Sequence, residues 1–245
     1  MRILTIFVLI LSLAACQQTD EDLKKPDTSE SKMAKSEATD TKTNGNQPSN
    51  SKPEASTDFS LLSDLPYETV ESDETCSEPV VIEFFAYQCP HCYKLESYAQ
   101  AWKEQNAGKV KFQSVPTHLG HQEFGAFLIV HHAAERLGLL KEATPALFKR
   151  LHEEKQSFAS QDDAAAFLVS IGATEQDAKA ALDDQESGKT AINDDFRLLS
   201  KYKISGVPTI LVNHRYKFDV TKAGGYDNVF KVVEETLKLP SNCSN

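Results

Sequence analysis

Two cysteines that are separated by two residues, Cys89 and Cys92, are the side chains of this sequence best suited to redox chemistry. Such a pair can close into a small disulfide ring and open again by exchange with another thiol. A helix that begins here places the first sulfur at its N-terminus, where free backbone N–H groups and the helix dipole favour a thiolate. His91 lies between the two cysteines and can stabilise the anion further. We therefore predict a redox-active disulfide in which Cys89 is the nucleophile, and a stabilised reduced form would make this disulfide an oxidant.

The flanking residues predict a strand, a helix and a second strand that hold this pair in place. Residues 80–87 are a continuous apolar and aromatic run, broken by Glu83, which is typical of a strand buried on both faces. Pro90 suits the first position of the helix, apolar residues follow at helical spacing, and Gly108 is expected to end it. Residues 109–115 alternate in polarity and predict a strand parallel to the first, reached by a right-handed crossover.

The remainder of the folded part predicts several helices, then two strands and a last helix. The helical patterns cover residues 122–137, 142–155, 162–171, 175–186 and 188–202, with capping signals at Ser160 and Thr174. Strand patterns return at 209–212 and 216–218, and the last helix is expected at 226–238 with Asp227 as its cap. This order resembles an α/β thioredoxin fold with a helical subdomain inserted at about residues 120–202.

Two acidic residues lie close to the cysteines in the sequence. Glu83 falls inside the buried strand, where a carboxylate is costly unless it has a task or a partner. One such task is catalytic: Glu83 would accept the proton of Cys92 when that thiol attacks a mixed disulfide. The alternative is that Glu83 reaches the sheet edge or pairs with a lysine. For Glu96, which follows Cys89 by seven residues on the helix, we expect a solvated surface carboxylate rather than a contribution to the local acidity.

Two further cysteines flank the predicted fold. Cys76 precedes the central strand and Cys243 follows the last helix, and a thioredoxin topology brings both to the end of the sheet away from Cys89. We expect a structural disulfide between them, worth on the order of 5 kcal/mol in the chain-entropy description, and export would let it persist. Two free thiols or an intermolecular link are the alternatives.

The first residues have the pattern of a secretory signal. A charge at Arg2 precedes an apolar run that is too short for an ordinary transmembrane helix, so we expect the chain to be exported. The run ends in LAAC, which resembles the lipobox of bacterial lipoproteins and assigns residues 1–15 as signal peptide and Cys16 as the lipidation site. Gln17 stands where Asp is the usual inner-membrane retention signal, which slightly favours the outer membrane. A plain secretory signal with an incidental cysteine is the alternative.

The residues after the cysteine predict a tether. Residues 16–58 are polar and charged with several prolines, and such a stretch cannot bury enough surface to offset the entropy of ordering it. The apolar residues, 40% of the whole chain, support a real core in a folded domain at 59–245, which we expect to be monomeric. The net charge of −10 argues against sequence-independent binding to nucleic acid or to anionic lipid headgroups.

A family resemblance rests on two motifs. The segment VIEFFAYQCPHCYKLE, followed much later by Gly206-Val207-Pro208-Thr209, resembles the DsbA family of thiol:disulfide oxidoreductases over roughly residues 75 to 240. The resemblance implies that Pro208 is cis and faces the active site, and that Val207 offers main-chain groups to a bound substrate strand. It also implies reduced exported proteins as substrates, a DsbB-type membrane reoxidant and no bound cofactor, in a periplasm-facing position in the cell envelope.

Three other functions fit parts of the sequence. An isomerase or reductase would use the same motif from a reduced resting state. A metal carrier or structural metal site would combine Cys89 and Cys92 with histidines such as His118 and His121 or the pair His131-His132, although a second pair of cysteines is absent, and we expect no metal. A redox-inactive tethered adaptor is disfavoured because both cysteines of the motif are present.

Overall fold

The computed structural model describes residues 65–243 of the chain. The predicted signal peptide, the lipidation site Cys16 and the tether at residues 16–58 lie outside the described residues. Within the described part, no helix is long and apolar enough to cross a membrane.

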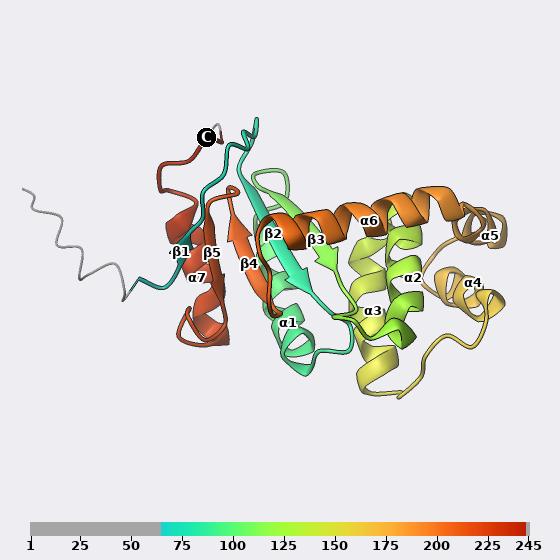
Figure 1. Cartoon of the computed structure of the whole chain (residues 1–245). Helices are drawn as coiled ribbons and strands as arrows, with labels where there is room; N and C mark the ends of the chain where they lie inside the picture. Colours follow the sequence, from blue (N-terminus) through green and yellow to red (C-terminus); the bar gives the residue numbers. More distant parts are fainter. Residues whose placement is uncertain (1–64, 244–245) are drawn as a thin grey trace, which may run out of the picture. The chain divides into compact units, whose positions relative to one another are not determined.

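A central sheet carries the fold, with its strands in the order β1-β5-β4-β2-β3 (Figure 1). The strands span Glu68–Thr69 (β1), Val80–Phe85 (β2), Lys111–Pro116 (β3), Thr209–Val212 (β4) and Tyr216–Asp219 (β5). β2 pairs in parallel with β3 and antiparallel with β4, and β5 pairs antiparallel with both β4 and β1. Every residue of β2 is buried, as predicted for a strand covered on both faces.

Helices cover the two faces of this sheet. Helix α1 (Pro90–Gln105) joins β2 to β3, and α7 (Tyr226–Thr236) packs beside it on the same face. The core between them includes Val81 from β2, Leu95 from α1 and Val233 from α7. The opposite face of β2 packs against residues at the C-terminal end of α6, which include Leu198 and Tyr202.

The predicted helical insertion is confirmed between β3 and β4. It consists of η2 (Gln122–Phe124), α2 (Gly125–Arg136), α3 (Leu140–His152), α4 (Gln161–Ser170), α5 (Glu175–Asp183) and α6 (Gln185–Lys201). Helices α2 to α5 gather beyond β3, and the long α6 leads the chain back to the sheet (Figure 1). The capping signals are also confirmed, because Ser160 and Thr174 each accept a hydrogen bond from the backbone N–H three residues on, at 3.1 Å.

Several boundaries differ from those predicted. The central strand ends at Phe85, so Ala86 and Tyr87 form the buried connection to α1. The prediction that Asp227 caps α7 is wrong: the cap is Gly225, whose φ of 118° is a conformation that suits glycine, and Asp227 lies in the first turn. The short edge strand β1 was not predicted, because two residues give no periodic signal.

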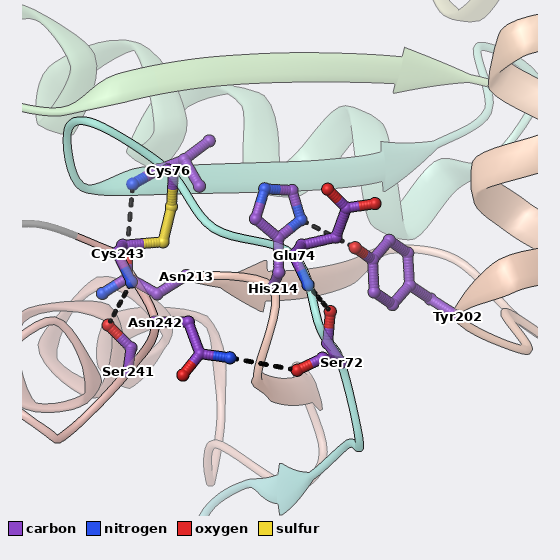
Figure 2. The surroundings of a disulfide bond; sticks show 10 residues. Ser72, Glu74, Cys76, Tyr202, Asn213, His214, Ser241, Asn242 and Cys243 are labelled. Carbon is purple, nitrogen blue, oxygen red and sulfur yellow. Dashed lines mark hydrogen bonds between the residues drawn. A yellow bond between two sulfur atoms is a disulfide. The ribbon is translucent and has the colours of Figure 1, made fainter.

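A disulfide joins Cys76 to Cys243, with the Cα atoms 4.3 Å apart (Figure 2). The neighbouring Asn242 donates a side-chain hydrogen bond to the Ser72 carbonyl at 3.2 Å, which ties the C-terminal segment to the same stretch of chain. Cys76 precedes β2 and Cys89 follows it, so the disulfide and the predicted redox pair lie at opposite ends of the central strand. This agrees with the placement expected from the topology.

We expect the disulfide to contribute stability without taking part in the chemistry. A Cys76→Ser/Cys243→Ser double variant should lose about 3 to 5 kcal/mol of unfolding free energy, because the bond closes a loop with a sequence separation of 167 residues. Denaturant titrations under oxidising conditions measure the loss. The alkylation rate of Cys89 should stay at the wild-type level, and a variant as stable as the wild type would contradict this role.

Candidate active site

The sulfur of Cys89 lies at the N-terminus of α1. Cys89 is the N-cap residue, and Pro90 occupies the first helical turn, where its missing N–H group leaves no hydrogen bond unmade. The backbone N–H of Cys92 donates to Cys89 Sγ at 3.2 Å. The N–H of Cys89 donates to the Ala86 carbonyl at 3.0 Å and fixes the turn between β2 and α1. The fold thus directs a hydrogen-bond donor of the helix end at this sulfur.

The two thiols differ strongly in acidity. Hydrogen bonds from the Cys92 thiol and from the backbone N–H groups of Cys92 and His91, together with the charge of His91, lower the pKa of Cys89 to about 6, although burial opposes them. Cys92 is 1% exposed, and burial, reinforced by Cys89, raises its pKa well above the usual range. At neutral pH Cys89 is therefore mostly a thiolate, while Cys92 is a thiol.

The loop before β4 faces Cys89. The peptide bond between Val207 and Pro208 is cis, and Cys89 Sγ lies 3.7 Å from the Val207 carbonyl oxygen. A groove of about 450 Å³ adjoins this loop, and its lining includes His91, Gly206–Thr209, Phe218–Lys222 and Tyr226. The structure thus brings the first cysteine, the intervening histidine and the residues of the Val207-Pro208 motif together where β2 ends and β4 begins.

Glu83 lies in the middle of β2 and is 3% exposed. Burial first, and then the nearby carboxylate of Glu96, raise its pKa to about 8, and Lys103 acts in the opposite direction. The charge of Glu83 in turn raises the pKa of Cys92, so the carboxyl group and the thiol interact electrostatically. Because β2 is flanked by β3 and β4, the alternative in which Glu83 reaches the sheet edge is wrong.

The expectation of a solvated Glu96 is also wrong, because this residue is only 5% exposed. It lies on the face of α1 that packs on the sheet, one residue after Leu95 and four before Gln100. Gln100 donates to its carboxylate at 2.6 Å and Lys103 lies 3.7 Å away, yet burial still raises the pKa of Glu96. The buried residues of α1 follow a helical stripe that includes position 96, and this stripe was the signal available in the sequence.

Tyr226 is a site residue that the sequence did not indicate. Its hydroxyl oxygen lies 2.7 Å from Nδ1 of His91, although 135 positions separate the two residues. The exposed His91 is thereby connected to the first residue of α7. No local pattern marks a contact of this kind, because it depends on how α7 packs beside α1.

One of the histidines considered as a metal ligand, His132, has two carboxylate partners. Within residues 65–243, the one group of three potential ligands is His131, His132 and Glu135, which does not include Cys89 or Cys92. The two ring nitrogens of His132 lie 3.0 Å from Glu135 and 2.8 Å from Asp195. These carboxylates raise the pKa of His132 to about 9 in spite of burial, which favours a protonated ring held between them.

Comparisons with known proteins agree with this geometry. A thioredoxin family model matches residues 74–234. The thiol:disulfide interchange protein DsbA of Burkholderia cepacia is 32% identical over 157 residues, which cover 62% of this chain and 72% of the relative. DsbA of Azotobacter vinelandii is 31% identical over 162 residues, with 64% and 73% covered. The crystal structure of Pseudomonas aeruginosa DsbA superimposes with a TM-score of 0.62 at 26% identity, covering 71% of this chain and 91% of that one.

The family model spans strands β2 to β5, the helical insertion and the Cys89-Cys92 segment together. The similarity therefore covers both the fold and the redox centre, and the geometry of the cysteines fits the reaction after which the relatives are named. This chain belongs to the DsbA family and is a thiol:disulfide interchange oxidoreductase with a thioredoxin fold and a helical insertion.

Proposed function

We propose that this oxidoreductase works as an oxidant that introduces disulfide bonds into exported proteins. The observation that carries the direction of electron flow is the thiolate of Cys89, which is held at the helix N-terminus with a pKa of about 6. A stabilised thiolate favours the reduced enzyme, so the oxidised enzyme readily accepts electrons. At pH 7, a Cys89 pKa one unit below the ambient pH stabilises the reduced enzyme by about 1.4 kcal/mol relative to a thiol that stays protonated. This raises the reduction potential by about 30 mV.

The forward reaction begins with the oxidised pair. A substrate thiolate attacks Cys89 Sγ, a substrate–Cys89 disulfide forms, and the bond between Cys89 and Cys92 breaks. Cys92 leaves as a thiolate and takes up a proton, as its raised pKa requires. The second thiolate of the substrate then attacks the substrate sulfur of the mixed disulfide and releases Cys89 as a stable thiolate. Two electrons pass from the substrate dithiol to the enzyme, and the substrate gains one disulfide.

Glu83 is the proposed proton carrier for Cys92. With a pKa of about 8 it is mostly protonated at neutral pH, so it can protonate the departing Cys92 thiolate. During reoxidation the step is reversed: Glu83 accepts the Cys92 proton while that sulfur attacks a mixed disulfide on Cys89. The charge of Glu83 raises the pKa of Cys92, and this electrostatic interaction supports the assignment.

Val207 and Pro208 are the proposed substrate-binding residues. The Val207 carbonyl faces Cys89 Sγ at 3.7 Å, on the side where the groove opens. An extended substrate segment that bonds to the Val207 main chain would bring its cysteine against Cys89. Reduced exported proteins are thus the proposed substrates, and a DsbB-type membrane protein is the proposed acceptor of the electrons.

The direction of electron flow can be tested by stoichiometric reaction with a dithiol peptide in the absence of oxygen. The oxidised protein should convert about one peptide dithiol to a disulfide per molecule and become reduced itself. Cys89 and Cys92 are then recovered as alkylatable thiols. If the peptide stays reduced while the reduced protein instead reduces peptide disulfides, the reductase alternative is correct.

We also propose that the enzyme is a lipoprotein anchored through Cys16 and facing the periplasm. The proposal rests on LAAC at residues 13–16 and on the polar composition of residues 16–58. Several acyl chains would hold it firmly, because each buried methylene adds about 0.8 kcal/mol. The absence of Asp at position 17 favours the outer membrane, with the tether extending the domain toward its partners.

A Cys16→Ser variant is expected to lose the anchor and keep the redox activity. The wild type should sediment with membranes and carry lipid on an N-terminal Cys16, as seen by mass spectrometry of the mature N-terminal peptide. The variant should no longer carry lipid and should be found in the soluble fraction or retain its signal peptide. An unlipidated wild type whose mature N-terminus lies elsewhere would establish the plain secretory signal.

A further inference from the structure

A tight turn holds Tyr226, the partner of His91, in place. The turn that leads into α7 is closed by backbone hydrogen bonds from Gly224 to the Thr221 carbonyl at 2.9 Å and from Gly225 to the Val220 carbonyl at 2.8 Å. Both glycines have positive φ, 77° and 118°, which other residues adopt only with strain. This turn directs the first residue of α7, Tyr226, at α1.

The ring of Tyr226 is fixed by two residues of α1. Tyr98 stacks on it, with ring centroids 6.3 Å apart and an interplanar angle of 26°. The ammonium of Lys94 lies 4.3 Å from the ring centroid, in a cation–π arrangement. His91, Lys94 and Tyr98 recur at three- and four-residue spacing on one face of α1, so the Tyr226 ring lies along this face with its hydroxyl at His91.

His91, in contrast, lies on the exposed surface of the first turn of α1. An exposed imidazole can adopt several orientations, and its effect on Cys89 depends on where the ring lies relative to that sulfur. A phenol hydroxyl can donate to Nδ1 of a neutral ring or accept from Nδ1–H of a charged one. The 2.7 Å contact can therefore hold the ring in both protonation states.

We propose that Tyr226 is a positioning residue that holds His91 in the orientation in which it stabilises the Cys89 thiolate. The inference deepens the proposed oxidant function and rests on it for its biological meaning. Its effect acts through His91, since Tyr226 makes no hydrogen bond to either sulfur in the described structure. One neutral hydrogen bond of this kind is worth about fivefold in an equilibrium constant.

Tyr226→Phe removes the hydroxyl and keeps the ring that packs on Tyr98 and Lys94. We expect the pKa of Cys89 to rise, as measured by thiolate absorbance or by the pH dependence of alkylation. The equilibrium with glutathione should shift about three- to tenfold toward the oxidised enzyme. Tyr202→Phe is the matched control, because it removes a tyrosine hydroxyl that also lies 2.7 Å from a histidine Nδ1, that of His214, near the Cys76–Cys243 disulfide (Figure 2), and it should leave both quantities at the wild-type values.

A double-mutant cycle with His91→Ala separates positioning from a direct effect on the sulfur. In the His91→Ala background, Tyr226→Phe should cause no further change in the pKa of Cys89 or in the glutathione equilibrium. An unchanged Tyr226→Phe protein, or an equal shift in both backgrounds, would overturn the proposal. Melting curves verify that each variant is folded. The wild-type reduction potential decides separately whether the enzyme is an oxidant, so the two claims fail in different ways.

Discussion

A Cys92→Ala variant is expected to accumulate mixed disulfides, whereas a Cys89→Ala variant is expected to form none. Cys89 has a pKa of about 6 and is half-buried, so it attacks disulfides at neutral pH, while the buried Cys92 has a strongly raised pKa. Without Cys92, the bond between Cys89 and a substrate cannot be resolved from within the enzyme. In the Cys89→Ala variant the rate of exchange should fall on the order of 10³-fold or more.

Non-reducing gel electrophoresis after rapid acid quenching, followed by mass spectrometry of the adducts, measures the trapped species. The Cys76→Ser/Cys243→Ser variant is the matched control, because it removes two cysteines at the opposite end of β2 and should trap nothing. Adducts on Cys92 in the Cys89→Ala protein, together with none on Cys89 in the Cys92→Ala protein, would reverse the assignment of the nucleophile.

Replacement of Glu83 is expected to change both the kinetics and the stability of the enzyme. Glu83→Gln keeps the size of the side chain but cannot exchange a proton, so attack by Cys92 during reoxidation should slow by about 10² to 10³-fold at neutral pH. Because the pKa of Glu83 is about 8, the wild-type rate should also respond to pH near this value, and the variant should lose that response. Stopped-flow measurement of reoxidation by a small disulfide provides both readouts.

The same substitution has a pH-dependent effect on stability. The folded-state pKa of about 8 lies above the unfolded value of about 4.3, so the folded protein retains a proton that the unfolded chain loses between these pH values. The free energy of unfolding is therefore highest below about pH 4. It decreases by on the order of 5 kcal/mol as the pH rises toward about 8. Glu83→Gln should unfold like the wild type at pH 4 and be several kcal/mol more stable at pH 8.

Glu96→Gln is the matched control for both experiments. Glu96 is buried on α1 with a raised pKa, but it has Gln100 and Lys103 as partners. Its replacement removes one carboxylate that raises the pKa of Glu83, so the pH response of reoxidation should move to lower pH and persist. A Glu83→Gln enzyme that reoxidises at the wild-type rate would exclude Glu83 as the proton carrier.

The sequence predicted the features that depend on local patterns. The apolar run of β2, the proline after Cys89 and the capping signals at Ser160 and Thr174 each reflect interactions between residues close in the chain. The thioredoxin-like order of these elements then placed Cys76 near Cys243, because the order of strands and helices fixes the end of the sheet at which each loop lies.

The features that the sequence did not predict depend on tertiary packing. Charge suggested that Glu96 would face water, but its position in the stripe of α1 buries it beside Glu83. The contact between Tyr226 and His91 depends on the angle at which α7 meets α1, and the Gly224-Gly225 turn that sets this angle has no counterpart in the pattern of the cysteine motif. These contacts link segments that are far apart in the chain.

The central claim is that the stabilised Cys89 thiolate makes this disulfide an oxidant, and the pH dependence of its reduction potential tests the claim most directly. Equilibration with glutathione at a series of pH values should give a potential at pH 7 above the value of about −270 mV known for thioredoxin. The potential should fall by about 60 mV per pH unit below the pKa of Cys89 and about 30 mV above it, with the break near pH 6. A thioredoxin-like potential with no break below pH 8 would contradict the account.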